Sequence, residues 1–252
     1  IIICIIFIQE SWKMKKRDLS IFLFILCIAI FFRFFRLSSV PPSASLDEVT
    51  IGYNAYSILQ TGSDEYGYRF PLLLRAYDDW RPGVYVYFVV PFIQFFDLGV
   101  ESVRLPSAIF SILTVIGAYL LTKELIKNKE IIVFHRTVSL KLFPFIAMFL
   151  LAISPWHIYI SRLGHEVNLG LFCFVSALLF FFRYVNNQSE RFALFLSSGF
   201  FAFSLYGYQS QKVIVPFLLI ALCLIFRQIV IKNAKEVAIA MGVGLVLILP
   251  LV

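Results

Sequence analysis

Residues 38 to 83 read SSVPPSASLDEVTIGYNAYSILQTGSDEYGYRFPLLLRAYDDWRPG, the one long run of the chain without a membrane-spanning pattern. The run holds six of the fifteen acidic residues, and two of them, Asp47 and Glu48, follow a Pro-Pro turn. After them, apolar and aromatic residues recur every three to four positions, at Val49, Tyr53, Tyr56 and Leu59. This spacing predicts a helix with one apolar stripe, whose positive dipole end favours the two carboxylates. We therefore expect the rest of the chain to be a scaffold for this segment.

Composition places the chain in a membrane. Sixty per cent of the residues are hydrophobic and 29 of the 252 are phenylalanine. Several nearly uncharged stretches reach the length of about 20 residues that a bilayer span requires. We predict an all-α, polytopic transmembrane helical bundle. The formal net charge of +7 comes from Lys and Arg between the spans, where cytoplasmic retention explains them, so nucleic acid is not an expected partner.

Basic residues set the expected orientation. They precede the first span, Leu19 to about Leu37, at Lys13, Lys15, Lys16 and Arg17. Residues 1–18 are therefore predicted to be a cytoplasmic segment, and residues 38–102 the first outer loop of a transmembrane module, 19–252. Near the exit of the first span, Arg33 and Arg36 are expected either to reach the outer headgroups or to meet lipid phosphates.

The segment Val84 to Phe96 is apolar, has 13 residues and contains Pro91. At 1.5 Å per residue it covers only about 20 Å of a hydrocarbon core about 30 Å thick. If it crossed the membrane, the later basic loops would fall outside, against the charge rule. We therefore predict a helix that lies along the outer interface.

The remaining spans are expected at about 103–122, 142–160, 167–184, 192–208, 213–231 and 237–252, which gives about seven in all. With this topology, residues 161–166 and 206–212 return to the outer side and face the first outer loop. The chain stops inside an apolar run, so we expect an N-terminal fragment of a longer protein.

Common catalytic motifs are absent from the sequence. It contains no phosphate-binding glycine loop, no HExxH and no GxSxG. The cysteines, Cys4, Cys27, Cys173 and Cys223, lie in apolar stretches without CxxC spacing. No disulfide, metal site or cofactor is therefore predicted, and a divalent metal requirement stays open.

Three acidic residues are candidates for catalysis: Asp47, Glu48 and Glu166. A carboxylate in a partly dry loop can take a proton from an acceptor hydroxyl. Alternatively, Asp47 could only cap the helix that it precedes. Glu166 could act in the same site, or only form an ion pair with Arg162 one turn earlier.

Candidate substrate-binding residues surround these acids on the outer side. Arg104 has a planar guanidinium that suits a lipid phosphate, although it could instead snorkel. The other members of the predicted set are Arg81, Arg162, His165, Lys212, Tyr53 and Trp80. Aromatic residues there suit either an interfacial belt or a sugar-stacking wall.

The order of these features resembles a known family. A Pro-rich turn, Asp47-Glu48 and a helix are followed by Arg81-Pro82-Gly83, Arg104-Leu-Pro-Ser-Ala, Ser154-Pro-Trp-His157, Ser161-Arg162 and Glu166. From about Lys15 to its end, the chain is similar to C-type glycosyltransferases of the dolichyl-phosphate-mannose protein mannosyltransferase and aminoarabinose transferase group, the glycosyltransferase family 39-like enzymes.

The resemblance implies a multi-pass inner-membrane enzyme that moves a sugar from a polyprenyl-phosphate carrier to an acceptor at the extracytoplasmic face. By this likeness, Asp47 matches the catalytic carboxylate, Glu166 a second acid and Arg104 an arginine at the start of the second span. Arg81-Pro82-Gly83 departs from the His-Pro-Pro of protein mannosyltransferases, so the acceptor is left open between lipid, glycan and protein.

Other function classes remain open. An O-antigen ligase-like transferase would use an undecaprenyl-diphosphate donor. A transporter or flippase would show broken helices at mid-membrane in two related halves. A scaffold subunit would have no carbohydrate-lipid affinity that depends on Asp47.

Overall fold

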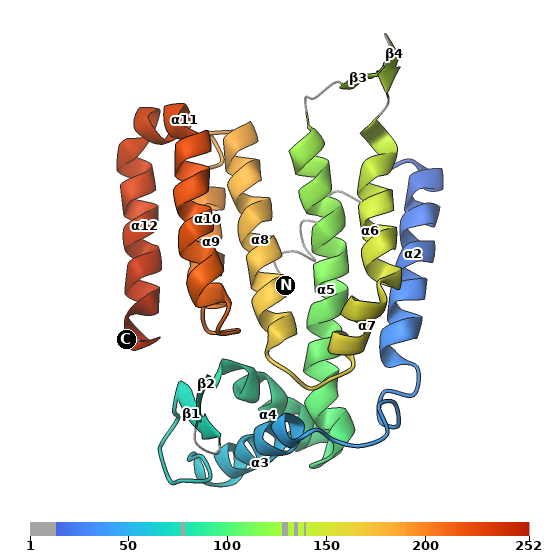
Figure 1. The fold of residues 1–252 in the computed structure, drawn as a ribbon, viewed down its shortest axis with the longest axis vertical. Coiled ribbons are helices and arrows are strands. Elements are labelled where there is room, and N and C mark those ends of the chain that lie inside the picture. The colour runs from blue at the N-terminus through green and yellow to red at the C-terminus, as the bar shows by residue number, and fades with distance from the viewer. Residues whose placement is uncertain (1–13, 77–78, 128–130, 134–135, 139, 252) are drawn as a thin grey trace.

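The computed structural model describes residues 14–76, 79–127, 131–133, 136–138 and 140–251. The described chain is mostly helical, as predicted (Figure 1). Residues 1–13 of the expected cytoplasmic segment, with Cys4, lie outside the described residues. Two antiparallel hairpins were not predicted: β1 (Leu73–Ala76) pairs with β2 (Asp79–Pro82), and β3 (Ile131–Val133) pairs with β4 (Arg136–Val138).

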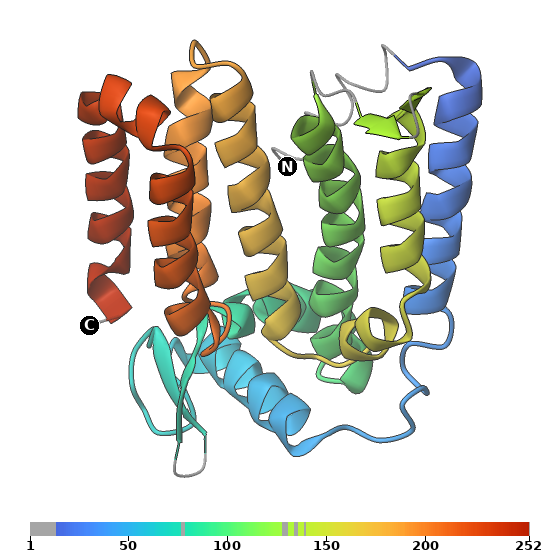
Figure 2. The same cartoon turned by 45° about the horizontal axis from the view of Figure 1, so that its top comes forward.

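The upright helices are α2 (Lys16–Phe34), α5 (Val100–Ile126), α6 (Phe143–Ile153), α8 (Val167–Asn186), α9 (Arg191–Ser204), α10 (Gln211–Ile225) and α12 (Ala234–Ile248). The other helices are α3 (Leu46–Thr61), α4 (Val84–Phe96), α7 (Pro155–Ser161) and α11 (Arg227–Lys232), with 3-10 turns η1 (Leu140–Leu142) and η2 (Leu249–Leu251). Figures 1 and 2 show the upright helices side by side, with α3 and α4 lying across one end of the bundle. We name this end the α3 end, and the opposite end the α11 end.

Membrane-spanning length is present in part of the bundle. Of the described helices, α5 and α8 are long and apolar enough to cross a membrane, and the pair Leu140–Ile153 and Pro155–Ser161, bent by 58°, is a third if it counts as one span. The apolar helices α4, α9 and α10 are shorter. Membrane association therefore has support from two to three helices, and the count of seven spans stays a prediction.

Charge differs between the two ends of the bundle. Basic residues occupy helix ends at the α11 end, at Lys123, Lys141, Arg183 and Lys232. The acidic segment around Asp47 lies at the α3 end. The positive-inside rule counts basic residues alone, and the α3 end also carries Arg81, Arg162 and Lys212, so the orientation of the bundle stays a prediction.

The helix α3 forms where the sequence predicts one, but a different face is buried. Val49, Tyr53 and Tyr56 of the predicted stripe are exposed, whereas Ile51, Ala55 and Ile58 are buried in one cluster with residues of α4 and α5. The apolar pattern predicted the helix, and the face that the helix buries differs from the predicted apolar stripe. An exposed aromatic face at the end of a bundle suits a membrane interface.

The sequence predicted that Arg33 reaches the outer headgroups or lipid phosphates. This prediction is wrong, because Arg33 on α2 is fully buried. Its donors bind Ser111 Oγ at 2.5 Å and His157 Nδ1 at 2.7 Å. They also bind the carbonyl oxygens of Leu151 and Ala152, at 3.1 and 2.9 Å, at the end of α6. Pro155 lacks the N–H that would bind Leu151 within a continuous helix, so Arg33 satisfies carbonyls that the α6–α7 break leaves open.

Candidate functional site

Ser45 begins α3 with a capping box. Its side-chain oxygen accepts a hydrogen bond from the Glu48 N–H at 3.2 Å, and Glu48 Oε2 accepts one from the Ser45 N–H at 2.8 Å. Two donors that the first helical turn leaves open are thereby satisfied. The N-cap is Ser45, so the alternative that Asp47 is only the N-cap is wrong. The spacing Ser-x-x-Glu was the available signal in the sequence.

Glu48 and Arg104 form a buried ion pair. Arg104 Nε donates to Glu48 Oε1 at 2.6 Å and Nη2 donates to Oε2 at 3.2 Å, and both side chains are almost completely enclosed. Arg104 also donates to the carbonyl oxygens of Leu37, Pro41 and Ser43, at 2.9 to 3.0 Å. All five guanidinium donors are thus bound within the protein. Arg104 therefore fixes the turn after α2, a role different from the phosphate binding expected from the sequence.

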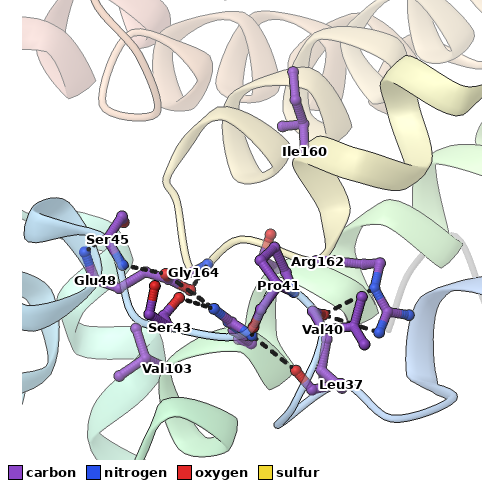
Figure 3. A network of polar contacts seen from close by, with 12 residues as sticks. Leu37, Val40, Pro41, Ser43, Ser45, Glu48, Val103, Ile160, Arg162 and Gly164 are labelled. Carbon is purple, nitrogen blue, oxygen red and sulfur yellow. Dashed lines mark hydrogen bonds and ion pairs between the residues drawn. The ribbon is translucent and has the colours of Figure 1, made fainter.

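The remaining acceptor capacity of Glu48 is also used. Gly164 N–H donates to Glu48 Oε1 at 2.9 Å, which ties the turn before α8 to the start of α3 (Figure 3). Burial by itself raises the pKa of Glu48, but hydrogen bonds from Arg104, Ser45 and Gly164 outweigh it, so the pKa of this carboxyl is lowered. Glu48 is charged and enclosed, and its role is structural where the sequence suggested catalysis.

Arg162 closes the same turn from another side. Its donors bind the carbonyl oxygens of Phe32, Phe35, Arg36 and Val40, at 2.7 to 3.1 Å. These carbonyls lie at and beyond the end of α2, where helical partners are lacking. The ion pair that the sequence suggested between Arg162 and Glu166 is not formed. The Arg162 guanidinium binds backbone carbonyls of this turn, although the sequence predicted that it binds substrate.

Asp47 points away from this enclosed network and lies in a second, partly exposed one. Arg81 Nη1 donates to Asp47 Oδ1, and His165 Nε2 lies 3.7 Å from Asp47 Oδ2. The other ring nitrogen, His165 Nδ1, lies 3.1 Å from Glu166 Oε2. The imidazole therefore stands between two carboxylates that are far apart in the sequence. We expected Asp47, Glu48 and Glu166 to share one pocket; Asp47 and Glu166 do lie on either side of His165, whereas Glu48 lies in the enclosed network.

We call this group the Asp47 cluster, and it consists of Arg81, Asp47, His165 and Glu166. Its side chains range from one third exposed to almost fully buried. Side-chain exposure is 32% for Arg81, 33% for Asp47, 21% for His165 and 7% for Glu166. Burial raises the pKa of Glu166 and outweighs the opposing charges of His165 and Arg81. The cluster thus joins an accessible carboxylate to a buried carboxyl group that retains its proton more readily.

The other predicted residues lie around the same end of the bundle. Trp80 on β2 is exposed, and its carbonyl accepts a hydrogen bond from Gln209 Nε2 at 3.1 Å. Tyr208, which follows α9, packs edge-on against His165 with ring centroids 5.8 Å apart. Lys212 is exposed at the start of α10, and Tyr53 is exposed on α3. Tyr208 was not among the predicted site residues, although its loop was expected to face Asp47.

Metal binding has no support from geometry. Among the residues that the structure describes, no group of three or more His, Cys, Asp or Glu side chains is arranged to hold a metal ion.

Comparison with known proteins adds no family. No family model, curated protein or solved structure matches the chain. The likeness to C-type glycosyltransferases therefore stays a prediction from the sequence.

Proposed function

We propose that the protein is a membrane glycosyltransferase that moves a sugar from a polyprenyl-phosphate donor to a hydroxyl group at the membrane face that bears α3. The observation that carries this proposal is the Asp47 cluster. It presents one accessible carboxylate at the end of a bundle that contains helices of membrane-spanning length. Arg81 donates to one oxygen of this carboxylate, and His165 Nε2 lies 3.7 Å from the other.

Asp47 acts as the general base. The acceptor oxygen attacks the anomeric carbon of the sugar, the bond from that carbon to the phosphate oxygen breaks, and the phosphate leaves with the electron pair. The proton of the acceptor hydroxyl passes to the Asp47 carboxylate. One displacement with base and leaving group on opposite faces inverts the configuration at the sugar carbon.

Arg81 is the cation of the cluster that can meet the leaving phosphate. It lies beside Asp47 and is partly exposed, unlike Arg104 and Arg162. A planar guanidinium binds phosphate oxygens through paired hydrogen bonds. The donor phosphate competes with the Asp47 carboxylate for this guanidinium, so donor binding at Arg81 releases the carboxylate to meet the acceptor hydroxyl.

His165 positions Asp47, and Glu166 positions His165. The ring cannot rotate without losing one of its two carboxylate neighbours, at 3.7 and 3.1 Å. Closure on a substrate that shortens the 3.7 Å approach would let His165 Nε2 donate to Asp47 and orient its carboxylate, and an oriented base gains rate.

The broken pair α6–α7 favours a transporter, because transporters bind substrates where helices break in the membrane. Arg33, the charged residue at this break, has all five donors bound to the protein. It therefore offers no donor to a substrate, and the transferase is the better supported function.

The test is Asp47→Asn in membrane vesicles supplied with a panel of radiolabelled polyprenyl-phosphate sugars. Removing a general base is expected to lower transfer on the order of 10² to 10⁴-fold. Asp18→Asn is a matched control, because Asp18 is 32% exposed and also pairs with an arginine, Arg17, but lies at the α11 end. Undiminished transfer by Asp47→Asn, or no transfer by the wild type from any donor, would overturn the proposal.

A further inference from the structure

A polar pocket lies between α3 and α4, away from the Asp47 cluster. Its volume is about 320 Å³. The lining residues are Tyr56, Leu59 and Gln60 from α3, and Ile93, Gln94, Asp97 and Leu98 from the end of α4 and the turn after it. Tyr56 is nine residues beyond Asp47, so about 14 Å of helix separates the pocket from the proposed base.

Four polar side chains converge on this pocket: Tyr56, Gln60, Gln94 and Asp97. In the part of the chain that the structure describes, none of these side chains has a hydrogen-bond partner. The neighbouring Asn54, by contrast, is bonded on both its oxygen and its nitrogen, to Thr50 and Glu65. The pocket therefore gathers side-chain donors and acceptors that the fold itself does not use.

Asp97 has φ +62° and ψ 174°, a backbone conformation that residues other than glycine rarely adopt. The Asp97 carbonyl accepts a hydrogen bond from Ser102 Oγ at 2.7 Å, which holds the turn in this shape. Strain of this kind persists where surrounding contacts enforce it, and it gathers at ligand-binding positions. Here it places Asp97 at the mouth of the pocket.

The lining defines the chemistry of the ligand. No basic side chain is among the seven lining residues, so the pocket does not suit a phosphate or another anion. Two amides, a carboxylate and a phenol supply several donors and acceptors for neighbouring hydroxyl groups. The Tyr56 ring, Leu59 and Ile93 supply an apolar wall for C–H groups. A ligand that matches this lining has hydroxyl groups on one side and C–H groups on the other. A neutral sugar has both.

We infer that the pocket between α3 and α4 is a carbohydrate-binding subsite that takes a neutral saccharide. Exposed Leu98 lines the pocket, and exposed Phe95 and Phe96 lie between the lining residues Gln94 and Asp97 in the chain. A saccharide carried on a membrane lipid can therefore reach it as well as a soluble glycan. Binding itself does not depend on the proposed transfer. Only the further step, that the acceptor of the transferase is a glycan, rests on the proposed function.

The experiment uses the full chain in phosphatidylcholine nanodiscs, because sugar-based detergents would compete. Saturation-transfer difference NMR measures binding of methyl α-mannopyranoside and methyl β-galactopyranoside. The variant Gln60→Ala/Gln94→Ala alters two exposed side chains and is expected to weaken binding at least about tenfold through the loss of two hydrogen-bonding groups. Gln228→Ala, an exposed glutamine at the α11 end, is the matched control and is expected to bind as wild type does.

Absence of a signal from either sugar on the wild type, or a full signal from the double variant, would overturn the subsite. Nanodiscs that contain a neutral monogalactosyl lipid distinguish the two sources. Loss of the free galactoside signal there supports a lipid-borne saccharide, and an unchanged signal supports a soluble one. If the wild type binds either sugar but transfers none from any polyprenyl-phosphate donor, the result counts against the proposed function alone and leaves the subsite standing.

Discussion

Asp47 and Glu48 are neighbours in the sequence, and each lies beside an arginine, yet the structure gives them opposite surroundings. Glu48 is enclosed with Arg104, whereas about a third of the Asp47 side chain is exposed, as is that of its partner Arg81. Successive side chains on a helix point about 100° apart, so one of the two turns inward when the other turns outward. The comparison separates two roles: Glu48 and Arg104 hold the segment in place, and Asp47 and Arg81 remain accessible to a ligand.

Replacing each arginine in turn tests this difference with the largest expected effect on the free energy of unfolding. Arg104→Met leaves the Glu48 carboxylate buried without its partner, so we expect a loss of about 3 to 5 kcal/mol in the free energy of unfolding. Arg81→Met removes a partly exposed pair and is expected to cost less than about 1 kcal/mol. Thermal unfolding in detergent measures both. Equal losses would show that the two ion pairs are equivalent.

A smaller effect is expected where the enclosed network meets the turn before α8. A Cβ atom on Gly164 would lie 2.5 Å from Val103 Cγ1 and 2.8 Å from the Val103 carbonyl oxygen. Gly164→Ala therefore forces this turn away from α5 and weakens the bond to Glu48, at an expected cost of about 1 to 3 kcal/mol. Gly99→Ala is the control, because nothing lies within 4 Å of its added Cβ. If the two alanines unfold alike, Gly164 does not anchor Glu48.

The smallest expected effects are the changes in unfolding temperature caused by two acid-to-amide substitutions, and these changes are expected to have opposite signs. The pKa of Glu48 is lowered in the folded protein, so its stabilising contribution is present above the unfolded pKa and is lost as the pH falls through the folded pKa. The pKa of Glu166 is raised by burial, so stability falls as the pH rises from the unfolded to the folded pKa. At neutral pH, Glu48 therefore stabilises the fold, whereas Glu166 costs stability.

Glu48→Gln is accordingly expected to lower the unfolding temperature at neutral pH, and Glu166→Gln to raise it. The two differences from wild type should shrink as the pH is lowered, because both carboxyl groups then become neutral like the amide. Thermal unfolding across a pH series measures them. Shifts of the same sign at neutral pH would contradict the distinction between a bonded and a merely buried carboxylate.

Much of the arrangement was predictable from the order of polar segments along the chain. The positions of basic residues placed Asp47 and residues 161–166 at the same end, and the 3.7 Å approach of His165 to Asp47 confirms this. The length of Val84 to Phe96 argued against a span, and α4 lies across the end of the bundle (Figure 2). Its place at a membrane interface stays a prediction.

Which acid would be enclosed was not predictable, because the enclosing groups come from distant parts of the chain. Arg104 is 56 residues beyond Glu48, and Gly164 is 116 residues beyond it. The same holds for Arg162, whose carbonyl partners lie more than 120 positions earlier than it does. Local spacing favoured Glu166 as the partner of Arg162, but unsatisfied backbone at the end of α2 competed successfully for its donors.

Arg33 has a consequence for how the chain is made. Its guanidinium binds carbonyls that occur 118 and 119 residues later in the sequence. While the ribosome has produced α2 but not yet α6, these donors lack those acceptors, and a bare guanidinium is poorly tolerated among lipid tails. The packing of α2 against α6 and α7 that Arg33 stabilises can therefore form only after α6 and α7 have been synthesised.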